Sequence, residues 1–269
     1  MKSVIRTLLR KLGLLNWLRR LRYRYQYRNL ISRLRGKDAF DVEFNGVHAQ
    51  FSVDDPFSAI FFATYFNSSV YEKEGLDILI RHVNTSSTVF DVGANIGYFT
   101  CLAGCYCSGG HVYAFEPGYE NVRILKRNID LNALTNTVTE YCAVSDLAGT
   151  VKFQNSPVGN AVLKMIETNT HNWDLIPVKS ITLDGYCEAQ RILPDFVKID
   201  VEGAEMKVLS GMENILAGNV KLLIEIHDKE LKEFNSSKEE VLNYLKSFGF
   251  TLEMIGNDAK KNLLIFASK

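Results

Sequence analysis

The sequence predicts an α/β protein built on a doubly wound, mostly parallel β-sheet. Buried apolar strands alternate with helix-length segments, the first of these strands ends in a glycine-rich turn, and two strands close the chain as an antiparallel edge. The chain has 269 residues, of which 46% are hydrophobic and 23% are charged. This composition is typical of a folded protein with one large domain or two small ones.

Residues 1–37 form a basic arm with twelve Lys or Arg and no acid, although the whole chain carries 31 basic and 31 acidic residues. Leucines recur there at helical spacing, which predicts an amphipathic helix. Basic residues interrupt every apolar stretch, so we expect neither a signal peptide nor a transmembrane helix. The helix fits peripheral contact with an anionic membrane at its inner face. It fits equally well packing on the acidic remainder of the chain or on a second copy in a homo-oligomer.

Residues 38–86 are expected to hold a β-hairpin and two helices. Alternating apolar and polar residues at 40–44 and 47–53 flank Asn45-Gly46, the strongest short signal for a hairpin. Helical stretches are expected at 56–66 and 72–82.

Residues 87–269 are expected to form one α/β domain. The expected strands are 88–92, 111–116, 137–144, 150–154, 178–183, 196–200, 221–227, 250–255 and 263–267. The expected helices are 98–107, 117–132, 204–216 and 238–248. Pro117 stands where the second of these helices would open, a position that tolerates proline.

The turn after the first strand of this domain reads Asp91-Val-Gly-Ala-Asn-Ile-Gly97. Glycine allows the sharp turn into a helix and leaves room for a ligand. Two glycines four residues apart differ from the G-x-G-x-x-G pattern that binds dinucleotides. The carboxylate of Asp91 would repel a pyrophosphate, but it suits the amino group of S-adenosyl-L-methionine, directly or through water.

The second strand ends in Glu116. An acid at this place accepts hydrogen bonds from both hydroxyls of a ribose and disfavours a 2′-phosphate. Together with the glycine turn, Glu116 favours a nucleoside cofactor over a structural coincidence.

Six segments in this order resemble the FkbM family of methyltransferases. They are Val89–Thr100, Phe115-Glu-Pro117, Ala143-Val-Ser-Asp146, Leu183-Asp-Gly185, Val197–Glu205 and Leu223–His227. The resemblance covers roughly residues 70–267, and its most distinctive piece is Lys198-Ile-Asp-Val-Glu-Gly-Ala-Glu205. It implies a Rossmann-like class I methyltransferase that uses S-adenosyl-L-methionine and O-methylates a hydroxyl of a sugar, a glycolipid or a small-molecule metabolite.

The resemblance also implies roles for residues of the cofactor site. The methionine part would be held by the turn and the start of the next helix, the ribose by Glu116 and the adenine by residues after the third strand. The candidate cofactor-binding residues are Asp91, Gly93, Ala94, Asn95, Gly97, Tyr98, Phe99, Glu116, Ser145 and Asp146. Asp146 could instead cap a turn before Gly149.

Candidate catalytic residues follow the fourth and fifth strands of the sheet, where open α/β sheets place reacting substrates. His227 is the first candidate for the general base, because its ordinary pKa near 6.5 suits proton transfer and Glu225 points the same way. Asp200 and Glu202 are rival bases, or carboxylates that cap the following helix. Carboxylates also suit Mg²⁺, but no dedicated metal spacing is present, so we expect no metal site.

Two other functions are compatible with parts of the sequence. A nicotinamide-dependent oxidoreductase shares the fold, but the missing third glycine and Asp91 argue against it. A non-catalytic nucleotide-binding module held at a membrane by the arm is the second alternative. The five cysteines have no second pair at zinc spacing, which favours reduced thiols in a cytoplasmic protein. The acidic body argues against a nucleic-acid partner, so we expect a small-molecule or glycan acceptor.

Overall fold

The computed structural model describes residues 38–54, 58–59, 61–62, 71–154, 175–257 and 262–269. The basic arm, residues 1–37, lies outside the described residues, and so does most of the helix expected at 56–66. Contacts divide the chain into two compact units, and each is described by itself. The larger unit holds residues 41–51 and 72–269, which include the helix expected at 72–82.

The expected hairpin is confirmed. Strands β1 (Ala39–Phe44) and β2 (Val47–Ser52) pair as a two-stranded sheet. Asn45 and Gly46 join them with φ of 48° and 80°. Two successive positive φ values make the turn whose twist matches the strands, which explains the Asn-Gly sequence.

The central sheet of the larger unit has seven strands in the order β11-β12-β10-β9-β3-β4-β5. Their bounds are β3 (Thr88–Val92), β4 (His111–Phe115), β5 (Thr137–Glu140), β9 (Phe196–Ile199), β10 (Lys221–Ile226), β11 (Thr251–Asn257) and β12 (Leu263–Ser268). Neighbours from β10 to β5 run parallel, whereas β12 runs antiparallel to both β10 and β11. The sheet is therefore mostly parallel, and the closing pair forms its antiparallel edge, as expected.

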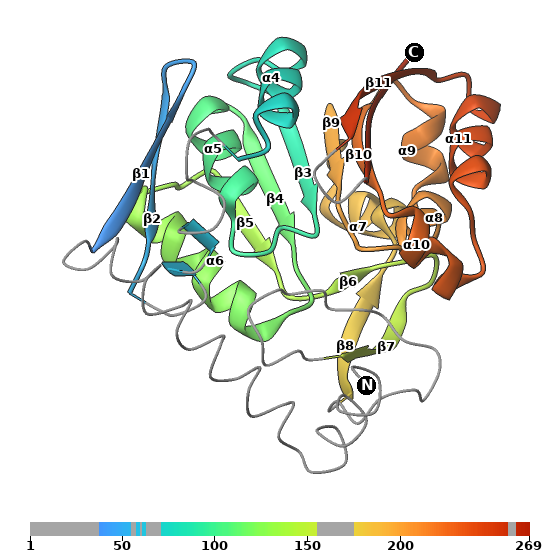
Figure 1. Cartoon of the computed structure of the whole chain (residues 1–269), viewed down its shortest axis with the longest axis horizontal. Coiled ribbons are helices and arrows are strands. Elements are labelled where there is room, and N and C mark those ends of the chain that lie inside the picture. The colour runs from blue at the N-terminus through green and yellow to red at the C-terminus, as the bar shows by residue number, and fades with distance from the viewer. Residues whose placement is uncertain (1–37, 55–57, 60, 63–70, 155–174, 258–261) are drawn as a thin grey trace, which may run out of the picture. The chain divides into compact units, whose positions relative to one another are not determined.

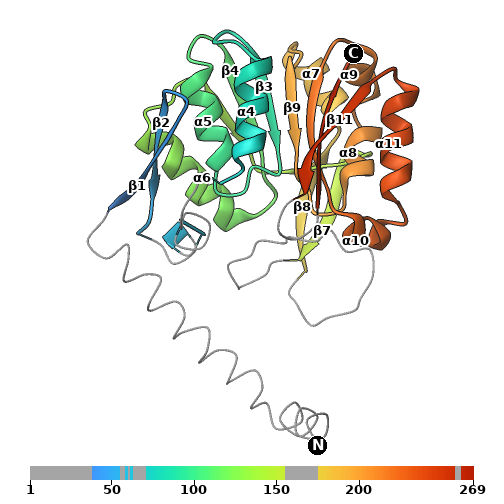
Figure 2. The ribbon, with the colours of Figure 1, turned by 45° about the horizontal axis from the view of Figure 1, so that its top comes forward.

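Helices cover both faces of this sheet (Figures 1 and 2). One face carries α4 (Lys73–His82), α5 (Tyr98–Tyr106) and α6 (Tyr119–Leu131). The other carries α7 (Leu183–Gln190), α8 (Glu205–Ser210), α9 (Glu213–Ala217) and α11 (Lys238–Ser247). Among the described residues, we find no helix with the length and apolar character needed to cross a membrane.

A second sheet of three strands has the order β6-β8-β7, with bounds β6 (Ala143–Val144), β7 (Gly149–Gln154) and β8 (Leu175–Ile181). The single strand expected at 137–144 is wrong. The chain turns after β5, where the Cys142 amide donates to the Glu140 carbonyl, and β6 then pairs with β8. The strand expected at 178–183 ends at Ile181, because the Thr182 side chain caps α7 by accepting from the Gly185 amide.

Two expected helices also need correction, and one short helix was not expected. The helix at 204–216 is divided into α8 and α9 at Gly211, whose backbone packs against the Ser145 carbonyl. Pro117 does not open α6, which begins at Tyr119 after Glu116 accepts from the Gly118 amide. A short helix α10 (Asp228–Leu231) and a 3₁₀ turn η1 (Lys232–Phe234) follow β10 where no helix was expected.

Side chains alternate between the two faces of β3. Phe90 and Val92 join the apolar core under α8 and α11, whereas Asp91 points to the opposite face and meets Thr100 of α5. The chain leaves β3 for β4 on one side, and β9 lies on the other, so the strand order reverses between β3 and β9. Open α/β sheets bind their ligands at the carboxyl ends of the strands beside such a reversal.

Candidate functional site

A pocket opens at this reversal, at the carboxyl ends of β3, β4 and β9. It contains about 640 Å³ of empty space, including the part open to solvent. The lining comes from the ends of β3, β4 and β9 and from β6 and β7. Its polar residues include Asn95, Glu116, Asp200 and Glu202, and its apolar residues include Val92, Phe115, Val144, Phe153 and Val201.

The glycine turn fits closely against the neighbouring strand ends. The amides of Gly93 and Ala94 donate to the Phe115 carbonyl at 2.9 and 3.1 Å. Gly93 has a φ of 85°, and a Cβ atom there would lie 1.8 Å from the carbonyl oxygen of Asp200. Only glycine meets both conditions, so Gly93 joins the ends of β3, β4 and β9 into one wall of the pocket.

Glu116 stands directly after β4 and is almost fully buried. Its Oε2 accepts from the Asn95 amide at 2.8 Å, and its Oε1 accepts from the Gly118 amide at 2.8 Å and the Asn121 side chain at 3.1 Å. Burial raises the pKa of Glu116 to about 7, although these hydrogen bonds oppose the shift. The carboxylate is therefore fixed in one orientation at the pocket wall.

The other expected cofactor residues lie behind this wall. Tyr98 and Phe99 are buried at the start of α5, and Gly97 begins that helix with a φ of 87°. Asp91 is fully buried, and its Oδ2 accepts from the Thr100 hydroxyl at 2.6 Å. Asp91 thus interacts with other residues of the protein, Thr100 and Lys198.

Ser145 and Asp146 also lie outside the pocket lining. The Ser145 hydroxyl donates to Asp146 Oδ1 at 2.8 Å, and Asp146 pairs with Lys207 at 3.7 Å. In this region the pocket is lined instead by the residues just before them, Cys142 to Val144, and by Phe153 of β7. The motif Ala143-Val-Ser-Asp146 indicated this region, but nothing in the sequence pattern indicated Phe153.

Lys198 is a buried cation that the motif contained but to which we assigned no role. Its Nζ lies 3.2 Å from Asp200 Oδ2, 3.9 Å from Glu72 Oε2 and 3.9 Å from Asp91 Oδ1. Its ammonium also lies over the ring of Phe99, 5.4 Å from the centroid. Burial alone lowers the pKa of Lys198, but these carboxylates raise it further than burial lowers it, so Lys198 is charged.

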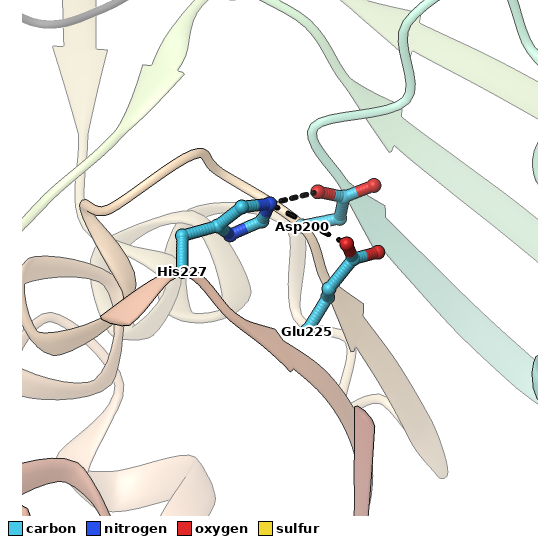
Figure 3. A group of neighbouring side chains, drawn as sticks. All are labelled: Asp200, Glu225 and His227. Atoms are coloured by element: carbon cyan, nitrogen blue, oxygen red, sulfur yellow. Dashed lines mark ion pairs between the residues drawn. The ribbon is translucent and has the colours of Figure 1, made fainter. Parts of the chain in front are cut away.

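His227 lies beside the candidate catalytic residues Asp200 and Glu202, and Figure 3 shows Asp200 and Glu225 next to its ring. Its Nε2 lies 3.7 Å from Asp200 Oδ1, 3.5 Å from Glu202 Oε2 and 3.5 Å from Glu225 Oε1. Its Nδ1 lies 2.7 Å from Glu205 Oε1. Burial lowers the pKa of His227, but the Glu205 hydrogen bond and the nearby carboxylates outweigh burial and raise it to about 10.

The residues of this cluster lie at different depths below the surface of the pocket. Asp200 and Glu202 line the pocket, whereas His227 is 2% exposed and lies behind them. Glu205 is fully buried and also accepts from the Gly203 amide at 2.9 Å. The sequence contained Glu205 at the end of the Lys198–Glu205 motif, but its partnership with His227 depends on the bend at Gly203.

Comparisons with known proteins agree with this geometry. A family model described as the methyltransferase FkbM domain matches residues 91–252. The hexuronic acid methyltransferase AglP of Haloferax volcanii is 30% identical over 158 residues, which are 58% of this chain and 62% of that protein. The 31-O-demethyl-FK506 methyltransferase FkbM of Streptomyces tacrolimicus is 26% identical over 219 residues, 70% of this chain and 79% of that protein.

A solved structure shares the fold. The methyltransferase FkbM from Methylobacillus flagellatus aligns with a TM-score of 0.52 and 18% identity. The alignment covers 79% of this chain and 53% of that chain. The chain therefore spans only part of this protein and of the Haloferax protein.

Proposed function

This chain belongs to the FkbM methyltransferase family, and from that premise we propose that it transfers a methyl group from S-adenosyl-L-methionine to a hydroxyl of a sugar, a glycolipid or another small metabolite. The observation that carries the proposal is a pocket at the sheet reversal whose polar lining is acidic: Glu116, Asp200 and Glu202. Carboxylates in a partly dehydrated pocket attract a ligand that carries a sulfonium and an ammonium group.

The residues of the pocket fit the parts of this cofactor. Glu116 would hold the ribose, because a fixed carboxylate can accept from two neighbouring hydroxyls. Gly93 and Asn95 would border the methionine part, and the apolar residues Val144 and Phe153 would border the adenine. When bound, the cofactor supplies an electrophilic methyl group on a positively charged sulfur. The same carboxylates disfavour the pyrophosphate of a nicotinamide cofactor, which argues against the oxidoreductase alternative.

The acceptor would reach the carboxyl end of β9, where Asp200 and Glu202 line the pocket. We propose that Glu202 accepts the hydroxyl proton, because its side chain is 29% exposed and reaches the pocket, whereas His227 lies behind it. His227 would then hold the carboxylates in place. The two relatives, whose names specify a hexuronic acid and the 31-O position of FK506, support an oxygen acceptor on a small molecule or sugar.

Replacing Glu116 with Ala tests the cofactor site. We expect S-adenosyl-L-methionine to bind at least about a hundredfold more weakly in calorimetry, because hydrogen bonds to a charged group contribute about 1.5–3 kcal/mol each. Glu120→Ala is the matched control, since Glu120 is an exposed residue of the same segment that pairs with Arg123. Circular dichroism checks that both variants are folded. Affinity like that of the wild type in a folded Glu116→Ala chain would rule out this cofactor site.

We propose further that the basic arm, residues 1–37, brings the protein to an anionic membrane surface. The twelve basic residues without an acid support this proposal, since each contributes about 1 kcal/mol near an anionic bilayer. Deleting residues 1–37 is expected to abolish co-sedimentation with vesicles that contain phosphatidylserine, and high salt is expected to release the full chain. If the deleted and full chains sediment alike, the arm instead packs on the protein or on a second copy.

A further inference from the structure

We propose that Asp200, Glu225 and His227 form a binding site for one divalent transition-metal ion of the Mn²⁺ type. This inference goes beyond the proposed function, because it requires neither a methyl donor nor an acceptor. The ligand atoms that the three residues offer all lie within 4.8 Å of one another, and they come from the adjacent strand ends of β9 and β10. Figure 3 shows both carboxylates turned toward the imidazole.

The distances fit a shared ion better than they fit hydrogen bonds. Nε2 of His227 lies 3.7 Å from Asp200 Oδ1 and 3.5 Å from Glu225 Oε1. An N–H···O hydrogen bond measures about 2.7–3.2 Å. Two ligand atoms that each lie about 2.1 Å from one metal ion, at angles of about 90–110°, are about 3.0–3.5 Å apart. The two separations from His227 are thus within a few tenths of an ångström of this range, and all three ligand atoms lie within 4.8 Å of one another.

Each of the three residues is oriented by a neighbour, which bonds His227 and Asp200 through their other polar atom and Glu225 through the oxygen that faces His227. His227 uses Nδ1 to bond Glu205 Oε1 at 2.7 Å, which directs Nε2 toward the carboxylates. Asp200 binds Lys198 through Oδ2 and presents Oδ1. Glu225 Oε1 accepts from the Asn262 side chain at 2.8 Å. Metal-binding histidines typically donate their other ring nitrogen to a carboxylate, and ligating carboxylates are typically held by hydrogen bonds.

The charge of the cluster also calls for a cation. Asp200, Glu202, Glu205 and Glu225 all lie within 4 Å of His227. Lys198 is paired with Asp200, and its ammonium also faces Glu72 and Asp91. Buried carboxylates are stable when they are paired or bind a metal. A dication at Nε2 would displace the proton of that nitrogen to solvent and take over the positive charge that these carboxylates otherwise stabilise on the imidazolium.

The ligand set indicates the kind of ion. Mg²⁺ and Ca²⁺ prefer sites made of oxygen atoms alone, whereas an imidazole among carboxylates suits Mn²⁺, Fe²⁺ or Zn²⁺. We therefore choose Mn²⁺ as the probe. The sequence shows no dedicated metal spacing, because Asp200 is far along the chain from Glu225 of β10 and from His227, which follows β10.

The experiment is a titration of the full chain with MnCl₂, without methyl donor or acceptor, followed by calorimetry and by the electron paramagnetic resonance signal of free Mn²⁺. We expect one ion per chain and weaker binding of Mg²⁺. His227→Ala and Glu225→Gln should each weaken Mn²⁺ binding at least tenfold, and Glu205→Gln should weaken it by about 10–100-fold. Glu188→Gln removes an exposed carboxylate of α7 and should leave binding unchanged.

The proposal is overturned if the wild-type chain binds no Mn²⁺ up to millimolar concentration. It is also overturned if His227→Ala and Glu225→Gln, folded by circular dichroism, bind Mn²⁺ as the wild type does. If one of the two fails to fold, the other decides. A failed metal titration together with normal binding of S-adenosyl-L-methionine would reject the metal site and leave the proposed function intact.

Discussion

Replacing Lys198 with Met is expected to lower the free energy of unfolding by about 3–5 kcal/mol, because the substitution leaves buried carboxylates without their cation. Lys198 is 6% exposed and lies within 4 Å of Glu72, Asp91 and Asp200. Asp91 is affected most, since it is fully buried and burial already raises its pKa. Methionine has a similar length, so the lost charge outweighs the lost packing.

Urea unfolding in a buffer with EDTA measures this change without a contribution from metal ions. Lys207→Met is the matched control, because Lys207 is more exposed and its ion pair with Asp146 spans 3.7 Å. We expect that control to change the free energy of unfolding by at most about 1 kcal/mol. If Lys198→Met were as stable as the control, the buried carboxylates would have to be neutral, and the acidic character that we assign to this site would be wrong.

The order of the central elements could be predicted from the sequence because local signals define them. Asn45-Gly46 predicted the hairpin, because few other dipeptides adopt two successive positive φ values. The apolar run that contains Phe90 and Val92 predicted a buried parallel strand with a glycine turn after it. Such a strand is buried on both faces, so its apolar residues stand out from their surroundings.

The breaks between elements could not be predicted in the same way. The expected strand 137–144 looks continuous in hydrophobicity, but its second half pairs with β8, about 40 residues away in sequence. Only the tertiary pairing divides it. The helix expected at 204–216 breaks at Gly211 because that residue packs against Ser145, a contact that no helical periodicity reports.

In the candidate site, too, some residues could be predicted from the sequence and others could not. Glu116 and Asp200 were recognisable as acids at strand ends, and they line one pocket. Glu72, Phe153 and Glu205 were not recognisable, because their roles depend on which face of the sheet they meet. Asp91 was recognisable as a conspicuous acid, but the alternation of β3 turns it toward α5 and Lys198. The sequence therefore predicts which acids lie at strand ends. Which residues they contact depends on the helices and strands that pack against that face of the sheet.

Replacing Glu202 with Gln is expected to lower kcat by about 10²–10⁴-fold, the usual contribution of a positioned general base. The amide keeps the size of the side chain but cannot take the hydroxyl proton. Binding of S-adenosyl-L-methionine should be unchanged, because the groups assigned to the ribose and adenine lie at β4, β6 and β7. The measurement uses whichever acceptor gives turnover in a panel of hexuronic acids and other sugars.

Asp228→Asn is the matched control, since it changes an exposed carboxylate directly after His227. It should leave kcat and cofactor affinity as they are. If Glu202→Gln turned over normally, Glu202 would not be the base, and Asp200 would be the next candidate. Asp200→Asn would then have to show the fall in kcat. A fall in cofactor affinity in Glu202→Gln would instead place Glu202 at the methyl donor. Of the four carboxylates near His227, we assign Asp200 and Glu225 to the metal and Glu205 to the support of His227, but Glu202 to neither role. The loss of kcat in Glu202→Gln should therefore persist when Mn²⁺ is saturating.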